Sequence, residues 1–378
     1  MKIGFDVSQT GSSKAGCGFL AEGLLRALER FSGGDEVFLY PAFGDVFWDP
    51  FCAKETYSTN HPSFHRLAPP ASFAESQEFW RHPGPDFEAR LGHPDVVQSN
   101  NFFCPRGLRH ARLVYTLHDL SFLVDPSWST EANRVGCLDG VFRAAVSADG
   151  ISANSEFTRR HFLEVFPHYP SERTAVVYPA SRYSLDAPAP ARPERFAHLA
   201  PAGFWLSVGS LEPRKNHRRL LEAYARSGSS LPLVLAGGKG WLMDDFAPPG
   251  GVVLTGYVSD RELEWLYRNC FAMLYPSLFE GFGMPVLEAL ASGASVICSN
   301  TTSLPEVAGE AALLVDPLDP AAMAAAMARL ASGEVSRDNL RAAGPRQARR
   351  FSWEASARKL LEIYRQSLES PKYFAATY

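Results

Sequence analysis

The sequence predicts an α/β fold with two domains, each built on a parallel sheet. The length of 378 residues suggests two domains, or at most three, at roughly 100–200 residues per domain. Short β-branched apolar runs alternate with amphipathic helical stretches, which is typical of parallel α/β sheets. The alternation starts a second time after residue 203. Hydrophobic residues make up 46% and charged residues 21%, a globular composition that excludes wholesale disorder.

In the first half, a strand at Lys2–Val7 leads into a glycine-rich turn at 11–18 and then a helical pattern with leucines three or four residues apart. Further strands are expected at Glu36–Tyr40, Asp95–Gln98, Arg112–Leu117, Gly150–Ala153 and Ala175–Tyr178. Residues 41–94 are rich in proline, histidine and phenylalanine, and the sequence leaves their structure and role open.

The composition shifts to proline and alanine between Pro179 and Gly203, which predicts an interdomain linker over 181–202. The domains are then expected at 1–180 and 203–352, followed by a crossover helix and tail at 353–378. The second alternation predicts strands at Phe204–Val208, Leu233–Leu235, Val252–Leu254, Phe271–Tyr275 and Ser295–Cys298, and helices at Arg218–Tyr224, Asp260–Asn269, Val286–Ala291, Pro320–Ala331 and Trp353–Leu368. A cleft between two such domains favours small-molecule binding.

Several classes of protein are excluded. Acidic residues number 41 against 37 basic ones, so the chain lacks the positive excess typical of nucleic-acid binders. The six cysteines are scattered without a CxxC pair, which disfavours zinc sites and a disulfide framework and favours a reduced cytoplasmic location. No apolar run approaches the roughly 20 residues of a membrane-spanning helix, and the first residues do not resemble a signal peptide.

The stretch from Glu280 to Glu288, EGFGMPVLE, is the most informative. Pro285 is expected to open a helix, which places Glu280 in the preceding loop and Glu288 in the first turn. Glycines 281 and 283 let backbone amides approach a ligand, and a helix N-terminus favours anions. The alternative, a capping glutamate with a surface glutamate, fits less well because a GFG sequence before proline is an unusual cap.

Two further segments follow predicted strands. Arg214 and Lys215 come after the strand ending at Val208, at the edge where α/β proteins bind ligands, and suit a diphosphate. A solvated basic turn is the alternative. His118 follows the strand Arg112–Leu117 in the other domain; a histidine is more often structural, but this position favours a ligand contact. Asp119 is expected to cap the next segment.

These motifs resemble those of retaining glycosyltransferases of family 4, which have the GT-B fold of two Rossmann-like domains facing across a cleft. The resemblance rests on the two glutamates Glu280 and Glu288, with seven residues between them, and on six ordered matches. These are GSLEPRKN at 209–216, TLHD at 116–119, ANSEFTR at 153–159, GYV at 256–258, SLPEV at 303–307 and FSW at 351–353. The resemblance implies that the first domain lies on the acceptor side, that the second binds the nucleotide sugar, and that the last helix packs back on the first domain.

The resemblance also implies roles for individual residues. Arg214 and Lys215 are similar to the pair that holds the donor diphosphate. Ser210 stands where many relatives have arginine, so Arg214 is expected to supply that charge. The remaining implied site residues are Glu280 with Gly281, Phe282 and Gly283 for the donor sugar, Glu288 for the ribose, His118 for the transferred sugar, Gly16 and Gly18 near the phosphates, and Tyr257 and Val258 for the donor.

A departing nucleotide diphosphate is stabilised either by a divalent metal or by fixed cations and helix dipoles. The sequence has no DxD pair suited to a metal, so we expect transfer without a metal or cofactor. The resemblance implies a retaining transfer of mannose or a deoxyhexose such as rhamnose. The donor is expected to be a GDP-sugar, with UDP- and ADP-sugars as open alternatives.

The acceptor is expected to be a glycan or lipid-linked oligosaccharide of surface polysaccharide synthesis, at the inner face of the plasma membrane. Two alternatives stay open: a nucleotide-sugar epimerase of the same fold, and a catalytically silent protein that binds sugar nucleotides.

Overall fold

The computed structural model describes residues 1–11, 14–44, 55–70, 72–242 and 248–374. Part of the region 41–94 that the sequence leaves open, including Cys52, lies outside these residues. The chain forms two compact units. The first contains residues 1–123 and 131–179 and the chain from Ser352 onward, and the second contains residues 124–130 and 180–351.

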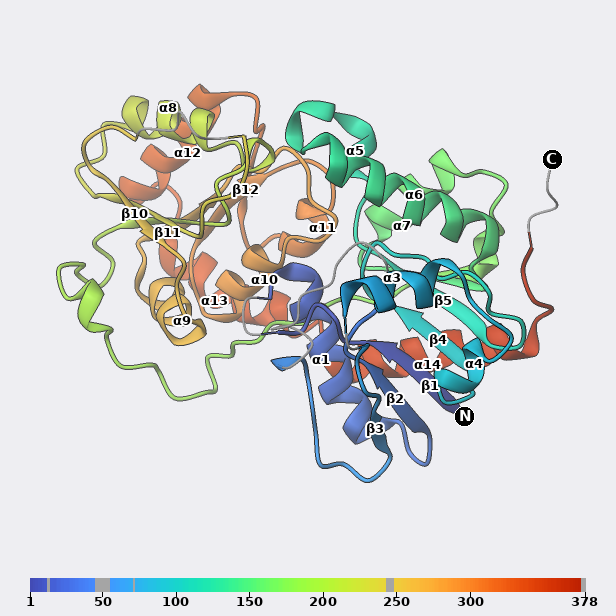
Figure 1. Cartoon of the computed structure of the whole chain (residues 1–378). Coiled ribbons are helices and arrows are strands. Elements are labelled where there is room, and N and C mark those ends of the chain that lie inside the picture. The colour runs from blue at the N-terminus through green and yellow to red at the C-terminus, as the bar shows by residue number, and fades with distance from the viewer. Residues whose placement is uncertain (12–13, 45–54, 71, 243–247, 375–378) are drawn as a thin grey trace. The chain divides into compact units, whose positions relative to one another are not determined.

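The first unit is built on a seven-stranded sheet in the order β3-β2-β1-β4-β5-β6-β7 (Figure 1). All its neighbouring strands are parallel, with Ile3 of β1 paired to Val37 on one side and Val96 on the other. The strands are β1 Lys2–Asp6, β2 Glu36–Tyr40, β3 Phe64–Arg66, β4 Val96–Ser99, β5 Arg112–Leu117, β6 Gly150–Ala153 and β7 Thr174–Val176.

Helices pack against this sheet and form two separate hydrophobic cores with it. Val96 packs with helices α1 and α14 in one core, whereas Val97, the next residue, packs in the other core with α6 and α7. This alternation follows from the two-residue period of a strand. The helices are α1 Gly16–Phe31, α3 Phe73–Arg81, α4 Phe87–Arg90, α5 Ser121–Val124, α6 Glu131–Ser147, α7 Glu156–Val165 and α14 Trp353–Glu369, with a 3₁₀ turn η2 at Ser171–Arg173.

The second unit has a six-stranded parallel sheet in the order β10-β9-β8-β11-β12-β13. Its strands are β8 Trp205–Val208, β9 Leu233–Ala236, β10 Val252–Gly256, β11 Ala272–Tyr275, β12 Val296–Ser299 and β13 Leu313–Val315. Its helices are α8 His217–Ser227, α9 Asp260–Asn269, α10 Met284–Ala291, α11 Leu304–Ala308, α12 Pro320–Ala331 and α13 Arg337–Ala348, with 3₁₀ turns η1 Pro126–Trp128, η3 Glu194–Phe196 and η4 Pro213–Lys215.

The predicted fold class is confirmed, since each unit is a parallel α/β layer structure. The last helix also lies where it was expected: α14 packs against α1 and beside β5 and β6 of the first unit. The contact with α1 is close, because a Cβ at Gly23 would lie 2.3 Å from the ring of Trp353. Glycine at position 23 therefore lets the tryptophan lie directly on α1.

The segment 181–202, predicted as a linker, is part of the second unit in the structure. Arg182 forms ion pairs with Asp260 and Glu288, and Arg268 donates to the carbonyl of Ser184. The proline-rich composition therefore predicted an irregular backbone, while charged side chains bind that backbone to α9 and α10.

The packing of α14 leads to a test of the first core. Leu360 is fully buried against α1 and the sheet, so Leu360→Ala should lower the free energy of unfolding by about 2–5 kcal/mol. Arg365→Ala, on the exposed side of the same helix, should change it by less than about 0.5 kcal/mol. Urea unfolding followed by circular dichroism measures both values, and equal effects would contradict this packing.

Candidate functional site

The predicted motifs of the second unit meet where the strand order of its sheet reverses, between β8 and β11. Strands β8 and β11 are neighbours, but α8 packs with α12 in one core while α10 packs on α9, α11 and α13. Helices that follow neighbouring strands on opposite faces create a crevice at the carboxyl edge, the usual ligand site of open α/β sheets. The turn after β8 carries Lys215, and the turn after β11 carries Glu280.

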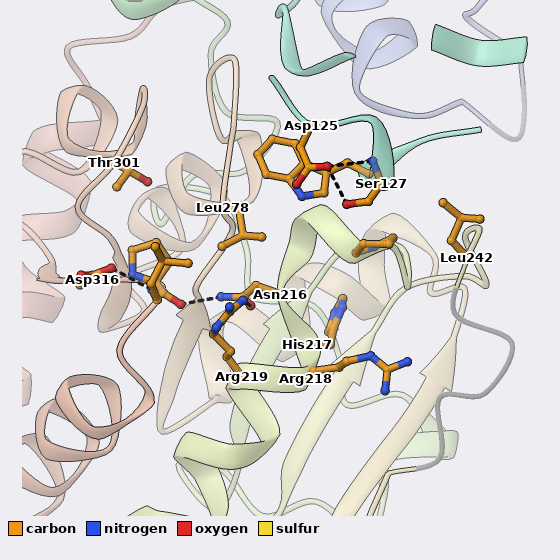
Figure 2. A pocket seen from close by; sticks show the side chains of 14 residues that line it. Asp125, Ser127, Asn216, His217, Arg218, Arg219, Leu242, Leu278, Thr301 and Asp316 are labelled. Carbon is orange, nitrogen blue, oxygen red and sulfur yellow. Dashed lines mark hydrogen bonds between the residues drawn. The ribbon is translucent and has the colours of Figure 1, made fainter. Parts of the chain in front are cut away.

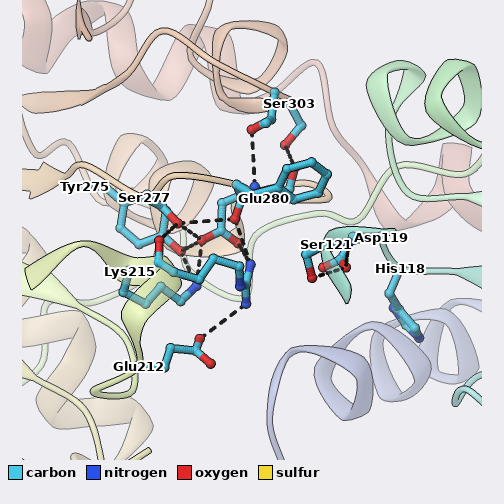
Figure 3. Close-up of polar contacts among 12 residues, drawn as sticks. His118, Asp119, Ser121, Glu212, Lys215, Tyr275, Ser277, Glu280 and Ser303 are labelled. Carbon is cyan, nitrogen blue, oxygen red and sulfur yellow. Dashed lines mark hydrogen bonds and ion pairs between the residues drawn. The ribbon is translucent and has the colours of Figure 1, made fainter. Parts of the chain in front are cut away.

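A buried carboxylate joins these two turns (Figure 3). Oε1 of Glu280 accepts hydrogen bonds from Lys215 Nζ at 2.6 Å, Ser277 Oγ at 2.6 Å and Tyr275 Oη at 2.9 Å. Its Oε2 accepts from Arg214 Nη1 at 3.1 Å. A carboxylate has about four acceptor sites, and four protein donors bond Glu280, three of them at Oε1. Glu280 is thus the counter-ion of both predicted cations.

The charges around Glu280 outweigh its burial. Desolvation by itself would raise the pKa of this carboxyl, but the positive charges of Lys215 and Arg214 lower it to about 2. Glu280 is therefore ionised at neutral pH and is a weak base.

The sequence analysis missed a second buried carboxylate in this cluster. Glu212, two residues before Arg214, accepts from Arg214 Nη2 at 3.3 Å through its Oε1. Its Oε2 is buried with no hydrogen-bond partner among the described residues. The sequence signal was present, since only Pro213 separates Glu212 from the basic pair in the LEPRK segment. The cluster therefore holds two cations and two carboxylates.

The glycines predicted around Glu280 shape the start of α10. Gly283 has a φ of 98° and is its N-cap, and a Cβ there would lie 2.4 Å from Leu304. Only glycine suits this conformation and spacing. The helix begins at Met284 with Pro285 in its first positions, as predicted. Gly281 and Phe282 precede it, and the Phe282 ring packs against Phe351 at 5.5 Å.

The SLPEV segment supports the backbone of Glu280, which explains physically why it accompanies this glutamate. The Glu280 N–H donates to Thr302 Oγ1 at 3.2 Å, and Ser303 Oγ donates to the Glu280 carbonyl at 2.9 Å.

The other predicted donor residues of this unit lie along the same sheet edge. Ser210 follows Gly209, whose carbonyl would lie 2.0 Å from a Cβ on Gly237. Tyr257 follows β10 and is 65% exposed, whereas the neighbouring Val258 is buried. The described contacts do not join these three residues to Glu280.

Glu288 differs from its predicted placement. It lies in the second turn of α10 instead of the first, and its side chain is buried rather than open to a ligand. Arg182 Nε donates to Glu288 Oε1 at 2.7 Å, and Tyr267 Oη donates to Oε2 at 3.3 Å. Burial raises the pKa of Glu288 more than the ion pair with Arg182 lowers it. Nothing in the sequence around Glu288 indicates this partner, because Arg182 lies 106 residues earlier.

In the first unit, His118 lies at the carboxyl edge of its sheet, directly after β5. Its Nε2 is 2.7 Å from the carbonyl oxygen of Asn100, and Asn154 Nδ2 donates to the His118 carbonyl at 2.7 Å. Asp119 caps the next segment as predicted, since its Oδ1 accepts from Ser121 N and Oγ (Figure 3). The histidine is thus held by the ends of three neighbouring strands.

Burial alone would lower the pKa of His118, but the charge and hydrogen bond of Cys17, the Asn100 carbonyl and Asp119 raise it to about 9. His118 is therefore protonated at neutral pH. Cys17, which the sequence analysis did not single out, lies between Gly16 and Gly18 in the first turn of α1.

The two glycines beside Cys17 differ in their surroundings. Gly18 is required by packing, because a Cβ there would lie 1.9 Å from the Gln9 carbonyl oxygen, whereas a Cβ on Gly16 would meet open space.

Asp6, at the end of β1, was also missed. Burial raises its pKa to about 6 although Ser8 and Asn100 donate hydrogen bonds to it.

In the described ranges, no group of three or more His, Cys, Asp or Glu side chains is placed to hold a metal ion.

Comparison with known proteins places this chain in a family. Residues 193–347 match the family model described as glycosyl transferases group 1. The chain is also 35% identical to the O-antigen chain mannosyltransferase B of Escherichia coli over 300 residues, which cover 75% of this chain and 78% of that protein. The chain belongs to the group 1 glycosyl transferases. It is therefore an enzyme, and its relatives support the transfer of a hexose.

One further relative and one solved structure are similar to this group 1 glycosyl transferase. It is 33% identical over 183 residues to the serotype-specific mannosyltransferase WbdA of Escherichia coli, covering 45% of this chain but only 22% of that protein. It superposes on the sucrose-phosphate synthase of Thermosynechococcus elongatus with a TM-score of 0.71 and 20% identity, covering 98% of this chain and all of that one. The structural likeness shows the predicted GT-B fold.

The buried ion pair of Glu288 can be tested as a coupled pair. Arg182→Met leaves the buried Glu288 carboxylate without its cation and should lower the free energy of unfolding by about 3–5 kcal/mol, whereas Glu288→Leu leaves Arg182 paired with Asp260 and should cost less. The double variant should recover most of that loss, as measured by chemical denaturation. The exposed pair Arg226 and Glu222 is the control, with a coupling below about 1 kcal/mol. Strict additivity at Arg182 and Glu288 would contradict the pairing.

The pKa of His118 leads to a pH prediction. The pKa of His118 in the folded state is about 9, above the ordinary value of 6.5, so protonation of His118 stabilises the fold. This contribution is complete below pH 6.5 and is lost as the pH rises through 9. Cys17→Ser should move the pKa of His118 downward, because it removes the sulfur that favours the imidazolium. Titration of the His118 ring signals by NMR measures this shift, with the other histidines as internal controls. An unchanged titration of His118 would contradict the assignment.

Proposed function

We propose that the chain is a retaining, metal-independent transferase of glycosyltransferase family 4. It moves mannose, or a deoxyhexose such as rhamnose, from a GDP-sugar to a glycan or lipid-linked oligosaccharide during surface polysaccharide synthesis. The printed names of two relatives, both mannosyltransferases and one acting on O-antigen chains, support the sugar and the pathway. The acceptor would be used on the cytoplasmic side of the membrane. In the described part of the chain, no helix has the length and apolar character to cross a bilayer.

The observation that carries the proposal is the cluster at the β8/β11 edge, in which Arg214 and Lys215 are held in place by buried carboxylates. Lys215 engages Tyr275 Oη and Glu280 Oε1 with two of its three ammonium hydrogens, and its side chain is 12% exposed. The third hydrogen suits a phosphate oxygen. The helix dipole gives the N-terminus of α10 a positive potential nearby. No acidic residue in its first turn and no side-chain cap offset this potential. These groups would stabilise the departing diphosphate without a metal.

The state of Glu280 supports retention without a covalent enzyme intermediate. A carboxylate that acts as nucleophile or base needs a free oxygen and a pKa near the working pH. Glu280 suits neither role well, because three protein donors bond its Oε1, Arg214 bonds its Oε2, and its pKa is about 2. We therefore propose same-face attack. The bond between the anomeric carbon and the diphosphate oxygen breaks, the acceptor oxygen bonds to that carbon, and the acceptor proton passes to the leaving phosphate.

The remaining residues have supporting roles in the proposal. His118 would contact the transferred sugar, as the resemblance implies. Glu288 would accept the ribose hydroxyls in place of hydrogen bonds that Arg182 and Tyr267 donate to its buried carboxylate in this structure.

Activity measurements test the proposal. With GDP-mannose and a mannose oligosaccharide, transfer should continue unchanged in EDTA, and the product should keep the α configuration by NMR. The double variant Lys215→Met, Glu280→Gln removes the cation without stranding its buried partner, and should lower kcat on the order of 10²–10³-fold. Lys359→Met, exposed on α14, is the control.

Three results would contradict the proposal: loss of transfer in EDTA, an inverted product, or a glycosyl adduct on Glu280. Conversion of the sugar nucleotide without any acceptor would favour the epimerase alternative instead.

A further inference from the structure

A pocket of about 550 Å³ lies at the carboxyl edge of the second sheet, beside the Glu280 cluster (Figure 2). Its walls come from the segments after β8, β11, β12 and β13 and from the turn η1. This turn follows α5 in the chain but belongs to the second unit. The volume is typical of small-molecule sites. Arg214, Lys215 and Glu280 are not among the described residues that line it.

The pocket and the Glu280 cluster share a wall. Pro213 and Leu278 line the pocket, and each lies one or two residues from a member of the cluster. The Leu278 N–H donates to the Arg214 carbonyl at 2.9 Å, which fixes the two turns against each other. The ring of Trp128, which also lines the pocket, lies 6.1 Å from that of Phe279. A molecule in the pocket would therefore lie next to the proposed diphosphate site without occupying it.

The walls of the pocket are held in place by buried hydrogen bonds. Asn216 has a left-handed backbone with φ of 62°, and its Nδ2 donates to the carbonyls of Pro276 and Pro317. Arg219 donates to Asn216 Oδ1 at 3.1 Å. Trp241 Nε1 donates to the Trp128 carbonyl at 2.8 Å, and Asp125 caps the turn through Ser127. The pocket is thus formed before any ligand binds, which lowers the entropic cost of binding.

The chemistry of the lining suits a sugar. Trp128 supplies an aromatic ring, whose face attracts the polarised C–H groups of a pyranose. Arg219 on one wall and Asp125 and Asp316 on others can donate to and accept from vicinal hydroxyls. A nucleoside diphosphate would meet the two carboxylates, and a lipid tail would have to cover several charged groups, so both fit less well.

We propose that this pocket binds the glycan acceptor, with a sugar ring of the acceptor stacked on Trp128 and its hydroxyls bonded by Arg219 and Asp316. The inference rests on the proposed function and names the part of the second unit that recognises the acceptor. Because Arg214, Lys215 and Glu280 do not line the pocket, it would hold acceptor residues beyond the one that reacts. Recognition should therefore improve with acceptor length.

Acceptor kinetics with a length series test this pocket. The probes are mannose, mannobiose and mannotriose on one aglycone, with GDP-mannose as donor. Trp128→Ala should raise KM for mannotriose about tenfold, the loss of one stacking contact, and leave KM for the donor and for mannose unchanged. Trp128→Phe should restore most of the affinity for mannotriose, which a merely structural role would not explain.

A second pocket variant and two control variants complete the experiment. Arg219→Gln should raise KM for mannotriose as well, whereas Arg226→Gln, exposed further along α8, should have no effect. Phe142→Ala removes an exposed aromatic ring of the first unit and should also leave every KM unchanged. The Arg219 variant keeps the test decisive if Trp128→Ala does not fold.

The outcomes separate this inference from the proposed function. An unchanged ratio of KM between mannose and mannotriose in both pocket variants would overturn it, and so would a rise confined to the KM for the donor. If no sugar nucleotide supports transfer, the proposed function fails. Saturation-transfer NMR with mannotriose then decides the pocket separately: binding that Trp128→Phe retains and Arg219→Gln weakens supports it, and no binding overturns it.

Discussion

The buried ion pair between Lys215 and Glu280 is the interaction on which the second unit's site depends. It connects the turns after β8 and β11, which are 65 residues apart in the sequence but adjacent at the sheet edge. Burying two charges is costly unless good geometry and further hydrogen bonds compensate them. Tyr275, Ser277 and Arg214 supply those bonds, so the pair holds the cations in fixed positions.

This arrangement assigns different tasks to the two conspicuous glutamates. Glu280 organises the cations and is too weakly basic to act as a nucleophile, whereas Glu288 is buried against Arg182 from a segment far earlier in the chain. Each carboxylate thus positions a basic side chain. Fixed positive groups of this kind do not have to reorganise when charge develops on a leaving group, which is the physical basis of electrostatic catalysis.

Much of the fold could be predicted because each strand is a short apolar run bounded by turn residues, as at Arg112–Leu117 and Gly150–Ala153, where the predicted bounds agree with the structure. The helix α6 was missed because Val135, Leu138 and Phe142 are exposed and blur its periodicity. Asp119 could be predicted as a cap because capping is local. The pairing of Arg182 with Glu288, and of Arg214 with Glu280, could not, because tertiary packing alone brings those charges together.

A crystal structure of the chain with a guanosine diphosphate bound in the presence of EDTA tests the central claim most directly. The account predicts a terminal phosphate oxygen about 2.7–3.2 Å from Lys215 Nζ, with Glu280 still bonded to the same ammonium group. A diphosphate bound away from the turns that carry Lys215 and Glu280, or binding that requires a divalent metal, would contradict it.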